Sequence, residues 1–215
     1  MRVVLLDNRD SFVYNLVDQL ALLGARTGVY RNTLPTEVLL AALEPTAEER
    51  DRGEHPLLCL SPGPGHPRTS GCLMPLTEAA LERGVPTLGI CLGFQALVEA
   101  CGGVIGPVGA VHGRSARVHV TEAGRHDAAL AVLAGGPLDV ARYHSLGTRT
   151  LPPDLAALAV TREQDPVGAD VVMAARHRYR PAVGLQFHPE SLLTPQGPAL
   201  LRALTVSLTG ESSTA

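Results

Sequence analysis

Residues 85–100 read VPTLGICLGFQALVEA, and this stretch decides how the rest of the chain is interpreted. The pattern predicts a short buried strand, a sharp turn at Cys91 and then a helix. Gly89 and Gly93 frame the cysteine, and their lack of a side chain lets the backbone turn and a substrate approach. A packed structural cysteine would be the usual role for a random cysteine. Because two glycines weaken a strand and a helix for no structural gain, the stretch favours a reactive Cys91.

The predicted helix after Cys91 bears directly on the chemistry of the sulfur. Its first N–H groups have no partner within the helix, and the positive end of its dipole points toward the turn. Both features favour a thiolate. The same N–H groups can stabilise an oxyanion, so the turn combines the two requirements of acyl transfer.

Composition places broad limits on what the chain does. The 215 residues are 45% hydrophobic, which suits one globular domain with a substantial core. The formal charge of -3 comes without a basic block, so nucleic acid is not an expected partner. No apolar run suggests a signal peptide or a membrane span, and no membrane association is expected. The four cysteines form no C-x-x-C pair, so a reducing cytoplasm is the expected location.

Apolar strand and helix patterns alternate through the first half of the chain, which predicts a parallel sheet covered by helices. After residue 103, short alternating segments predict antiparallel strands added to that sheet. The whole is an α/β fold with an open, mostly parallel central sheet flanked by helices. We expect a domain over residues 1–209 and a disordered tail over 210–215. The predicted strands are 2–7, 27–30, 57–60, 85–90, 116–121, 138–143, 171–176 and 183–187, and the predicted helices are 12–23, 35–43, 71–83, 92–100 and 200–208.

The loop SPGPG at residues 61–65 follows a predicted strand at its carboxyl end, where ligands bind in open α/β sheets. It does not suit phosphate, because Pro62 and Pro64 lack N–H donors and no Gly-Lys-Ser/Thr ending is present. What remains is a rigid loop that offers one N–H, at Gly63. A plain tight turn would explain the loop equally well.

A cysteine nucleophile needs a base and a group that orients the base. His188 ends a predicted buried strand, and Glu190 lies two residues further on, so in an extended segment both side chains point the same way. Glu190 can then hold the far nitrogen of the imidazole and fix its tautomer. No histidine or cysteine pair has a zinc-like spacing, so we expect no metal. The polar segment Arg142–Gly147 could line a pocket or form a turn.

Four segments together resemble the class I (triad) glutamine amidotransferases. They are GICLGFQ at 89–95, SPGPG at 61–65, RYHSL at 142–146 and FHPES at 187–191. The resemblance covers nearly the whole chain and implies a flavodoxin-like α/β fold. Within the family, Gly65 and the run at 95–100 look most like the glutaminase subunits of anthranilate synthases. The glutaminase subunits of aminodeoxychorismate synthases, which act in folate synthesis, are the close alternative.

The resemblance implies a role for each residue. Cys91 would attack the side-chain amide of L-glutamine, His188 would pass the thiol proton to ammonia, and Glu190 would orient His188. The N–H groups of Gly63 and Leu92 would form the oxyanion hole. The positions that would bind glutamine or its oxyanion are Gly63, Pro64, Gly65, Leu92, Gln95, Ser145 and Leu146.

The family also implies a partner. Ammonia would pass to a synthase subunit, component I, which would bind chorismate and use Mg²⁺, while this chain would need no cofactor. We expect the partner to contact Asn8–Tyr14 and His66–Ser70, which flank the predicted site. The alternatives are a stand-alone cysteine hydrolase that acts on γ-glutamyl bonds and a binding subunit without catalytic activity.

Two features depart from the family pattern. Phe94 stands where the family usually has histidine, and on a helix it would point away from Cys91, so we expect altered packing there and not lost activity. The segment Glu44–Pro56 is longer than usual, and its many charges predict a solvated surface loop.

Overall fold

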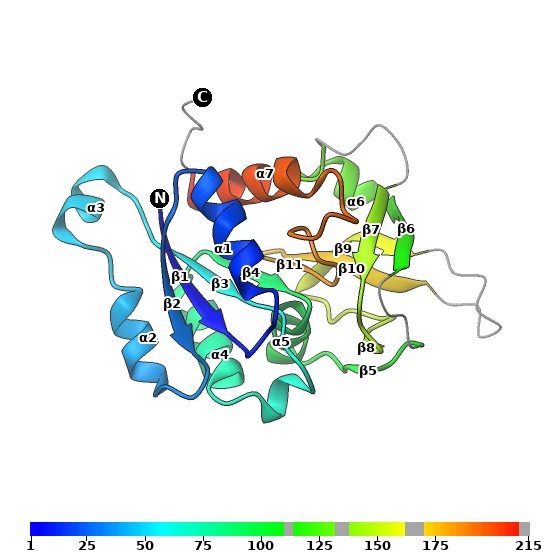
Figure 1. Cartoon of the computed structure of the whole chain (residues 1–215), viewed down its shortest axis with the longest axis horizontal. Helices are drawn as coiled ribbons and strands as arrows, with labels where there is room; N and C mark the ends of the chain where they lie inside the picture. Colours follow the sequence, from blue (N-terminus) through cyan, green and yellow to red (C-terminus); the bar gives the residue numbers. More distant parts are fainter. Residues whose placement is uncertain (110–113, 132–137, 162–169, 211–215) are drawn as a thin grey trace.

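The computed structural model describes residues 1–109, 114–131, 138–161 and 170–210. A nine-stranded sheet runs through the molecule in the order β2-β1-β3-β4-β11-β10-β9-β6-β7 (Figure 1). The strands from β2 to β11 pair in parallel, and those from β11 to β7 pair antiparallel. The prediction of a mostly parallel sheet with antiparallel additions is therefore confirmed. The strands are β1 (Arg2–Asp7), β2 (Arg26–Arg31), β3 (Leu57–Leu60), β4 (Thr87–Ile90), β6 (Arg114–Val120), β7 (Leu138–Arg142), β9 (Leu155–Thr161), β10 (Val171–His177) and β11 (Ala182–Leu185).

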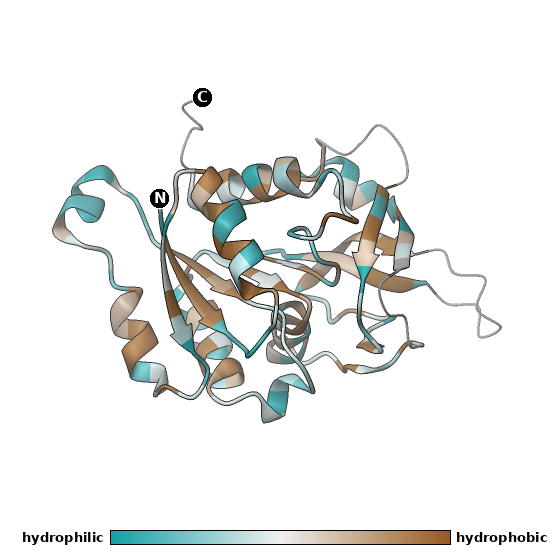
Figure 2. Cartoon of the chain, in the orientation of Figure 1, coloured by the Kyte–Doolittle hydropathy of each residue, from teal (hydrophilic) through white to brown (hydrophobic). Residues whose placement is uncertain are grey.

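Helices cover both faces of the parallel half. On one face lie α1 (Val13–Leu22) and α7 (Gly197–Thr209), and on the other α2 (Thr36–Ala42), α4 (Leu73–Arg83) and α5 (Leu92–Ala100) (Figure 1). Alternate residues of β1 divide between the two cores, with Val3 and Leu5 packing in the first and Val4 and Leu6 in the second. A strand buried on both faces must be apolar throughout, and Figure 2 shows β1 as a mainly brown band beside the edge strand β2, which is partly teal and largely exposed.

The topology brings the loops that carry chemistry to one edge. Because β2 and β3 lie on opposite sides of β1, the connections that follow β1 and β3 diverge and leave a crevice at the carboxyl ends of these strands. Residues 8, 61–65 and 91 follow β1, β3 and β4 at this edge, and residues 186–188 follow β11. All of them therefore meet at the position where open α/β sheets bind ligands.

Smaller elements complete the chain, and one strand differs from expectation. The strand β9 has the sequence LAALAVT, and its alanines favour a helix as much as a strand, so the pattern alone did not predict it. In the fold it pairs with both β10 and β6, which settles its conformation. The other short elements are β5 (Gly106–Pro107), β8 (Leu146–Gly147), α6 (Glu122–Arg125) and the 3₁₀ turn η1 (Pro67–Thr69).

The predicted surface loop Glu44–Pro56 was wrong in part, because it contains the helix α3 (Ala47–Arg52). Thr46 and Glu49 form a capping box, each side chain bonding to the other's backbone N–H, and Gly53 ends the helix with φ 66°. The Glu49 carboxylate is buried and accepts two hydrogen bonds of 2.8 Å from the Arg2 guanidinium. The charges of this segment thus serve capping and anchoring as well as solvation.

The domain expected over residues 1–209 and the tail expected over 210–215 stay predictions. Gly210, with φ 71°, ends α7, and residues 211–215 of the expected tail lie outside the described residues. Across the described residues, no helix combines the length and apolar character needed to cross a membrane.

Replacing Glu49 by glutamine should destabilise the protein in a pH-dependent way. The Arg2 hydrogen bonds lower the pKa of Glu49 to about 2, against the opposing effect of its burial. A lowered pKa gives stability that is complete above the unfolded value of about 4.3 and is lost as pH falls through about 2. We expect Glu49→Gln to lower the free energy of unfolding by about 2 kcal/mol at pH 7. Urea denaturation at several pH values measures this.

The difference between the variant and the original chain should shrink as pH falls from about 5 toward about 2. The exposed neighbour Glu48 offers a matched control, since Glu48→Gln removes a charge from the same helix without touching Arg2. Equal losses in the two variants would show that the Arg2 contact is not the stabilising interaction.

Candidate active site

Cys91 occupies a strained turn between β4 and α5. Its φ of 51° and ψ of −98° lie outside the regions that residues with a side chain normally adopt. Its N–H donates to the Leu185 carbonyl at 2.7 Å, and its own carbonyl accepts from the Gln95 N–H at 3.0 Å. The backbone on both sides of the sulfur is therefore held by the sheet and by the helix, and the predicted strand-turn-helix corner is present.

The two glycines that frame Cys91 are required by close packing, so the expectation that they bring no structural gain was wrong. A Cβ at Gly93 would lie 2.3 Å from the Leu60 carbonyl oxygen, and a Cβ at Gly89 would lie 2.6 Å from the carbonyl of Gly93. Any side chain at either position would push α5 away from β3 and β4. The first turn of α5 consequently sits directly on the sheet, and its free N–H groups lie beside Cys91.

His188 and Glu190 form a buried pair just beyond β11. The His188 Nδ1 and the Glu190 Oε1 are 2.7 Å apart, and the two side chains are 8% and 2% exposed. The His188 backbone is fixed by its N–H, which donates to the Ala141 carbonyl at 3.2 Å, and by its carbonyl, which accepts from the Thr194 hydroxyl at 2.7 Å. The structure thus brings His188 and Glu190 together as the sequence predicted, but it does so through a turn, in which the Ser191 N–H donates to the His188 carbonyl at 3.3 Å, and not through the expected extended segment.

The electrostatics of His188 favour its protonated form. Burial alone would lower the pKa of the imidazole, but hydrogen bonding and charge attraction from Cys91 and Glu190 outweigh it and raise the pKa well above its ordinary value. Nε2 itself has no partner of full hydrogen-bond geometry among the described residues. This nitrogen is therefore the one left to exchange a proton with Cys91, and such contacts often tighten only with substrate.

Gly63 and Leu92, the two predicted oxyanion donors, lie next to each other. A Cβ at Gly63 would lie 3.0 Å from the Leu92 side chain and 2.5 Å from the Asn8 carbonyl oxygen. The loop is held by Asn8, which donates from its backbone to the Ser61 hydroxyl at 2.9 Å and from its amide to the Ser61 carbonyl at 3.0 Å. Two segments far apart in sequence therefore converge beside the sulfur.

A cavity of about 530 Å³ opens over Cys91. Its walls come from the loop at 63–66 on one side and from the segment at 143–146 on the other, with Gln95 of α5 between them. The open question on Arg142–Gly147 is thereby answered, because residues 143–146 line this cavity. The cavity is lined by Gly63, Pro64, Gly65, His66, Thr69, Cys91, Gln95, Tyr143, His144, Ser145 and Leu146.

The cavity wall at residues 143–146 is held in place by hydrogen bonds to the Leu146 carbonyl. The Leu146 oxygen lies 2.9 Å from the amide nitrogen of Gln95 and 2.9 Å from the Nδ1 of His144. Burial, and then the charge of Arg142, lower the pKa of His144 to about 3, so the ring is neutral near pH 7 and its Nδ1 carries the hydrogen that the carbonyl accepts. The backbone at 145–146 is consequently held in one orientation toward the cavity.

The cavity lining also includes His66, Thr69, Tyr143 and His144, which were not predicted as site residues, and two unpredicted residues, Gln186 and Tyr143, contact the catalytic groups themselves. Gln186 is fully buried, and its amide nitrogen lies 3.6 Å from the Cys91 sulfur. Tyr143 meets the His188 ring edge to face, with centroids 5.1 Å apart and planes at 78°. Gln186 could have been found from its spacing, because it lies two residues before His188 and interrupts an apolar strand.

Phe94 lies in the core, away from the sulfur. It is 1% exposed and packs with Val98 and Ile105, and a Cβ at Gly184 would lie 2.6 Å from its ring. This placement agrees with the packing role that was expected at the position where the family usually has histidine.

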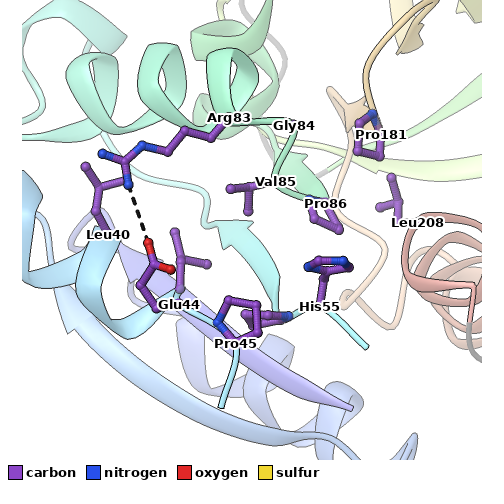
Figure 3. A pocket seen from close by; sticks show the side chains of 12 residues that line it. Leu40, Glu44, Pro45, His55, Arg83, Gly84, Val85, Pro86, Pro181 and Leu208 are labelled. Carbon is purple, nitrogen blue, oxygen red and sulfur yellow. Dashed lines mark ion pairs between the residues drawn. The ribbon is translucent and has the colours of Figure 1, made fainter. Parts of the chain in front are cut away.

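A second cavity, of about 360 Å³, lies at the opposite edge of the sheet, near the amino ends of β3 and β4 (Figure 3). Its polar features are His55 and an ion pair of 3.7 Å between Arg83 and Glu44, and the rest of its wall is mainly leucine, valine and proline. It contains no nucleophile, so the candidate active site is the cavity over Cys91. The described part of the chain contains no group of three or more histidine, cysteine, aspartate or glutamate side chains that could hold a metal ion.

Comparison with known proteins agrees with this geometry. The family model described as glutamine amidotransferase class-I matches residues 4–208. A protein of Corynebacterium glutamicum named anthranilate synthase component 2 is 44% identical over 210 residues, which cover 93% of this chain and 94% of that protein. The protein of the same name from Haemophilus influenzae is 43% identical over 202 residues, with the same coverage of both chains.

Solved structures support the fold at lower identity. A putative GMP synthase protein from Thermoplasma acidophilum superposes with a TM-score of 0.77 at 20% identity, over 97% of this chain and 94% of that one. A glutamine amidotransferase from Thermotoga maritima gives 0.68 at 17% identity, over 97% of both chains. Together with the match over residues 4–208, these findings confirm the resemblance inferred from the sequence: the chain belongs to the class-I glutamine amidotransferase family.

Proposed function

We propose that this chain is the glutamine-hydrolysing subunit, component 2, of an anthranilate synthase, an enzyme of tryptophan synthesis. The observation that carries the proposal is the strained Cys91 beside the buried pair of His188 and Glu190, in a chain whose relatives at 43–44% identity bear that name. Ammonia released here would aminate chorismate on the partner subunit. The names of these relatives favour this over the aminodeoxychorismate branch, because each is named for anthranilate synthase.

The chemistry begins with transfer of the Cys91 thiol proton to the Nε2 of His188. The sulfur then attacks the side-chain carbonyl carbon of glutamine and forms a tetrahedral oxyanion. As this collapses, His188 gives its proton to the amide nitrogen, which leaves as ammonia, and a glutamyl thioester remains. A water molecule, deprotonated by His188, attacks the thioester and releases glutamate with the free thiol. Glu190 keeps the imidazole in one orientation throughout.

The substrate would lie between the two walls of the cavity over Cys91. The N–H groups of Gly63 and Leu92 would receive the oxyanion. Pro64 and Gly65 would shape the near wall. Gln95 and the backbone of Ser145 and Leu146 would hold the amino-acid end of glutamine. This chain would use no cofactor, and Mg²⁺ would serve the chorismate-binding partner.

Component 1 would cover the apolar surface beside the site. Phe12, Tyr14 and Leu192 are 57%, 66% and 99% exposed, and Phe12 and Leu192 line a hollow of about 320 Å³ that His188 also borders. Exposed aromatic and aliphatic side chains beside a catalytic group are typical of an interface. Within the expected contact segment Asn8–Tyr14, Asn8 is buried against Ser61, so Phe12 and Tyr14 would make the contact.

A stand-alone hydrolase of γ-glutamyl bonds is the other candidate. High turnover of glutamine or γ-glutamyl peptides without any partner would favour it, whereas weak turnover that rises on addition of component 1 supports the proposal. Co-purification from the source cell, followed by assay of the complex with chorismate and glutamine, separates these two functions.

Replacing Cys91 by alanine should abolish glutamine-dependent anthranilate formation, by about a thousandfold or more, because no thioester can form. Synthesis from added ammonium salt should be unchanged, since ammonia reaches the partner without this site. Cys101→Ala is the matched control: burial raises the pKa of that thiol to about 11, so it stays protonated and unreactive near pH 7. Normal glutamine-dependent rates in Cys91→Ala would refute the assigned nucleophile.

Replacing Glu190 by glutamine should lower kcat for glutamine hydrolysis by about a hundredfold or more. Glu190 helps to raise the pKa of His188, so the imidazolium of the original chain persists to higher pH. In the variant, the imidazolium should lose its proton at a lower pH. The pH profile of kcat/KM reports this shift. The exposed Glu78 on α4 provides the control Glu78→Gln, which should leave the profile in place.

Replacing Leu192 by glutamate should weaken binding of component 1 by about tenfold or more, because a charge would be buried in an apolar contact. Leu22, at the far end of α1, is 76% exposed and gives the control Leu22→Glu. Titration of each variant with the purified partner measures the dissociation constants. Equal affinities for both variants would place the interface elsewhere.

A further inference from the structure

We propose that Gln186 is a further catalytic residue, whose side-chain amide donates a hydrogen bond to the Cys91 sulfur and stabilises it as a thiolate. The inference rests on the proposed function for the identity of the reaction, and on the geometry of Gln186 for the contact itself. The amide nitrogen lies 3.6 Å from the sulfur, within the range of N–H···S bonds, and the side chain is fully buried.

The orientation of the amide follows from its neighbours. The Leu146 carbonyl can only accept, so the nitrogen of the Gln95 amide must face it, at 2.9 Å. The same nitrogen lies 3.3 Å from Gln186, which must therefore present its oxygen there. The nitrogen of Gln186 is left on the side of the sulfur. A backbone acceptor thus fixes both amides and makes Gln186 a donor to Cys91.

The position of Gln186 is determined by the sheet and not by the sulfur. Its backbone N–H donates to the Met173 carbonyl at 2.8 Å, which continues the pairing of β11 with β10. Its amide oxygen accepts from Gln95 at 3.3 Å and its amide nitrogen faces the sulfur at 3.6 Å, so both ends of the amide are engaged. The donor is consequently held in place before any charge develops, as effective electrostatic stabilisation requires.

An N–H directed at sulfur acts differently on the two protonation states. A thiol sulfur is a weak acceptor, whereas a thiolate carries a full charge and accepts strongly. Among the residues that the structure describes, the titratable side chain that interacts with the sulfur is His188, which interacts in turn with Glu190, Asp10 and His144. Gln186 supplies a donor that cannot lose its proton, so its effect persists over the pH range in which His188 titrates.

The same contacts connect the sulfur to the wall of the cavity. Gln95 lines the cavity and bonds to Gln186, which bonds to Cys91. We expect the loss of Gln186 to reduce kcat more than it raises KM, because the contact lies on the nucleophile and not on the substrate.

The experiment compares Gln186→Leu and Gln186→Glu. Alkylation of Cys91 by iodoacetamide is followed by peptide mass spectrometry from about pH 5 to 10, without glutamine or partner. Removing the donor should raise the midpoint of the alkylation profile by about one pH unit. Glutamate should raise it further, because it puts a carboxylate beside the sulfur. Gln19→Leu, the same change on α1, is the control and should leave the midpoint unchanged.

The two variants separate electrostatics from packing. Glutamate has nearly the shape of glutamine and leucine does not, so a residue that only fills space would be harmed more by leucine. Midpoints unchanged in both variants, or moved only by leucine, would overturn the proposal. Thermal unfolding of each variant shows that the chain tested is folded, and a variant that does not fold is replaced by Gln186→Met, which keeps the side-chain length without a donor.

The readout also distinguishes this inference from the proposed function. Alkylation tests the Gln186 contact alone, while assay of the complex with chorismate tests the biological reaction. A shifted midpoint in a chain that supports no anthranilate formation would retain the role of Gln186 and refute the proposed pathway. An active complex whose Gln186 variants alkylate and turn over normally would refute only the role of Gln186.

Discussion

The backbone conformation of Cys91 is the constraint on which the site depends. A residue with φ of 51° and ψ of −98° costs on the order of 1–3 kcal/mol and persists only when its surroundings leave no alternative. Here the Cys91 N–H is bound to Leu185 of β11, and the following turn of α5 lies against Leu60 of β3. Both neighbours belong to the buried parallel sheet, so relaxing the turn would require moving two strands.

The antiparallel half of the sheet has a part in the same site. A single bridge joins Ala141 of β7 to His188, and the chain that leaves β7 continues into the wall at 143–146. Although β7 is at the far edge of the nine-stranded order, Ala141 near its end pairs with His188, which follows β11. The parallel strands therefore carry the nucleophile and the base, and the added strand β7 braces the base and leads into one wall of the cavity.

Much of the fold and the site could be predicted from local sequence patterns. The features that depend on contacts between distant segments could not. The Gly89-x-Cys91-x-Gly93 turn and the His188–Glu190 spacing are encoded within a few residues, so their geometry can be read directly. The alanine-rich β9 needed its neighbours to become a strand. The capping box of the helix that contains Glu49 could be recognised in the sequence. The ion-pair partner of Glu49, Arg2, lies 47 residues away, and no local pattern indicates that pairing.

The burial of Cys91 governs both the reactivity of its sulfur and the rigidity of its surroundings. Cys91 is 8% exposed, and His188 and Glu190 are buried with it, so charges at the site interact through protein and not through water. In that low-dielectric setting an unpaired charge is strongly destabilising. An imidazolium and a thiolate are therefore most stable when they are paired with each other and when hydrogen-bond donors surround the thiolate. Gln186 and the N–H groups at the start of α5 meet this need, and they can do so only because the sheet holds them still.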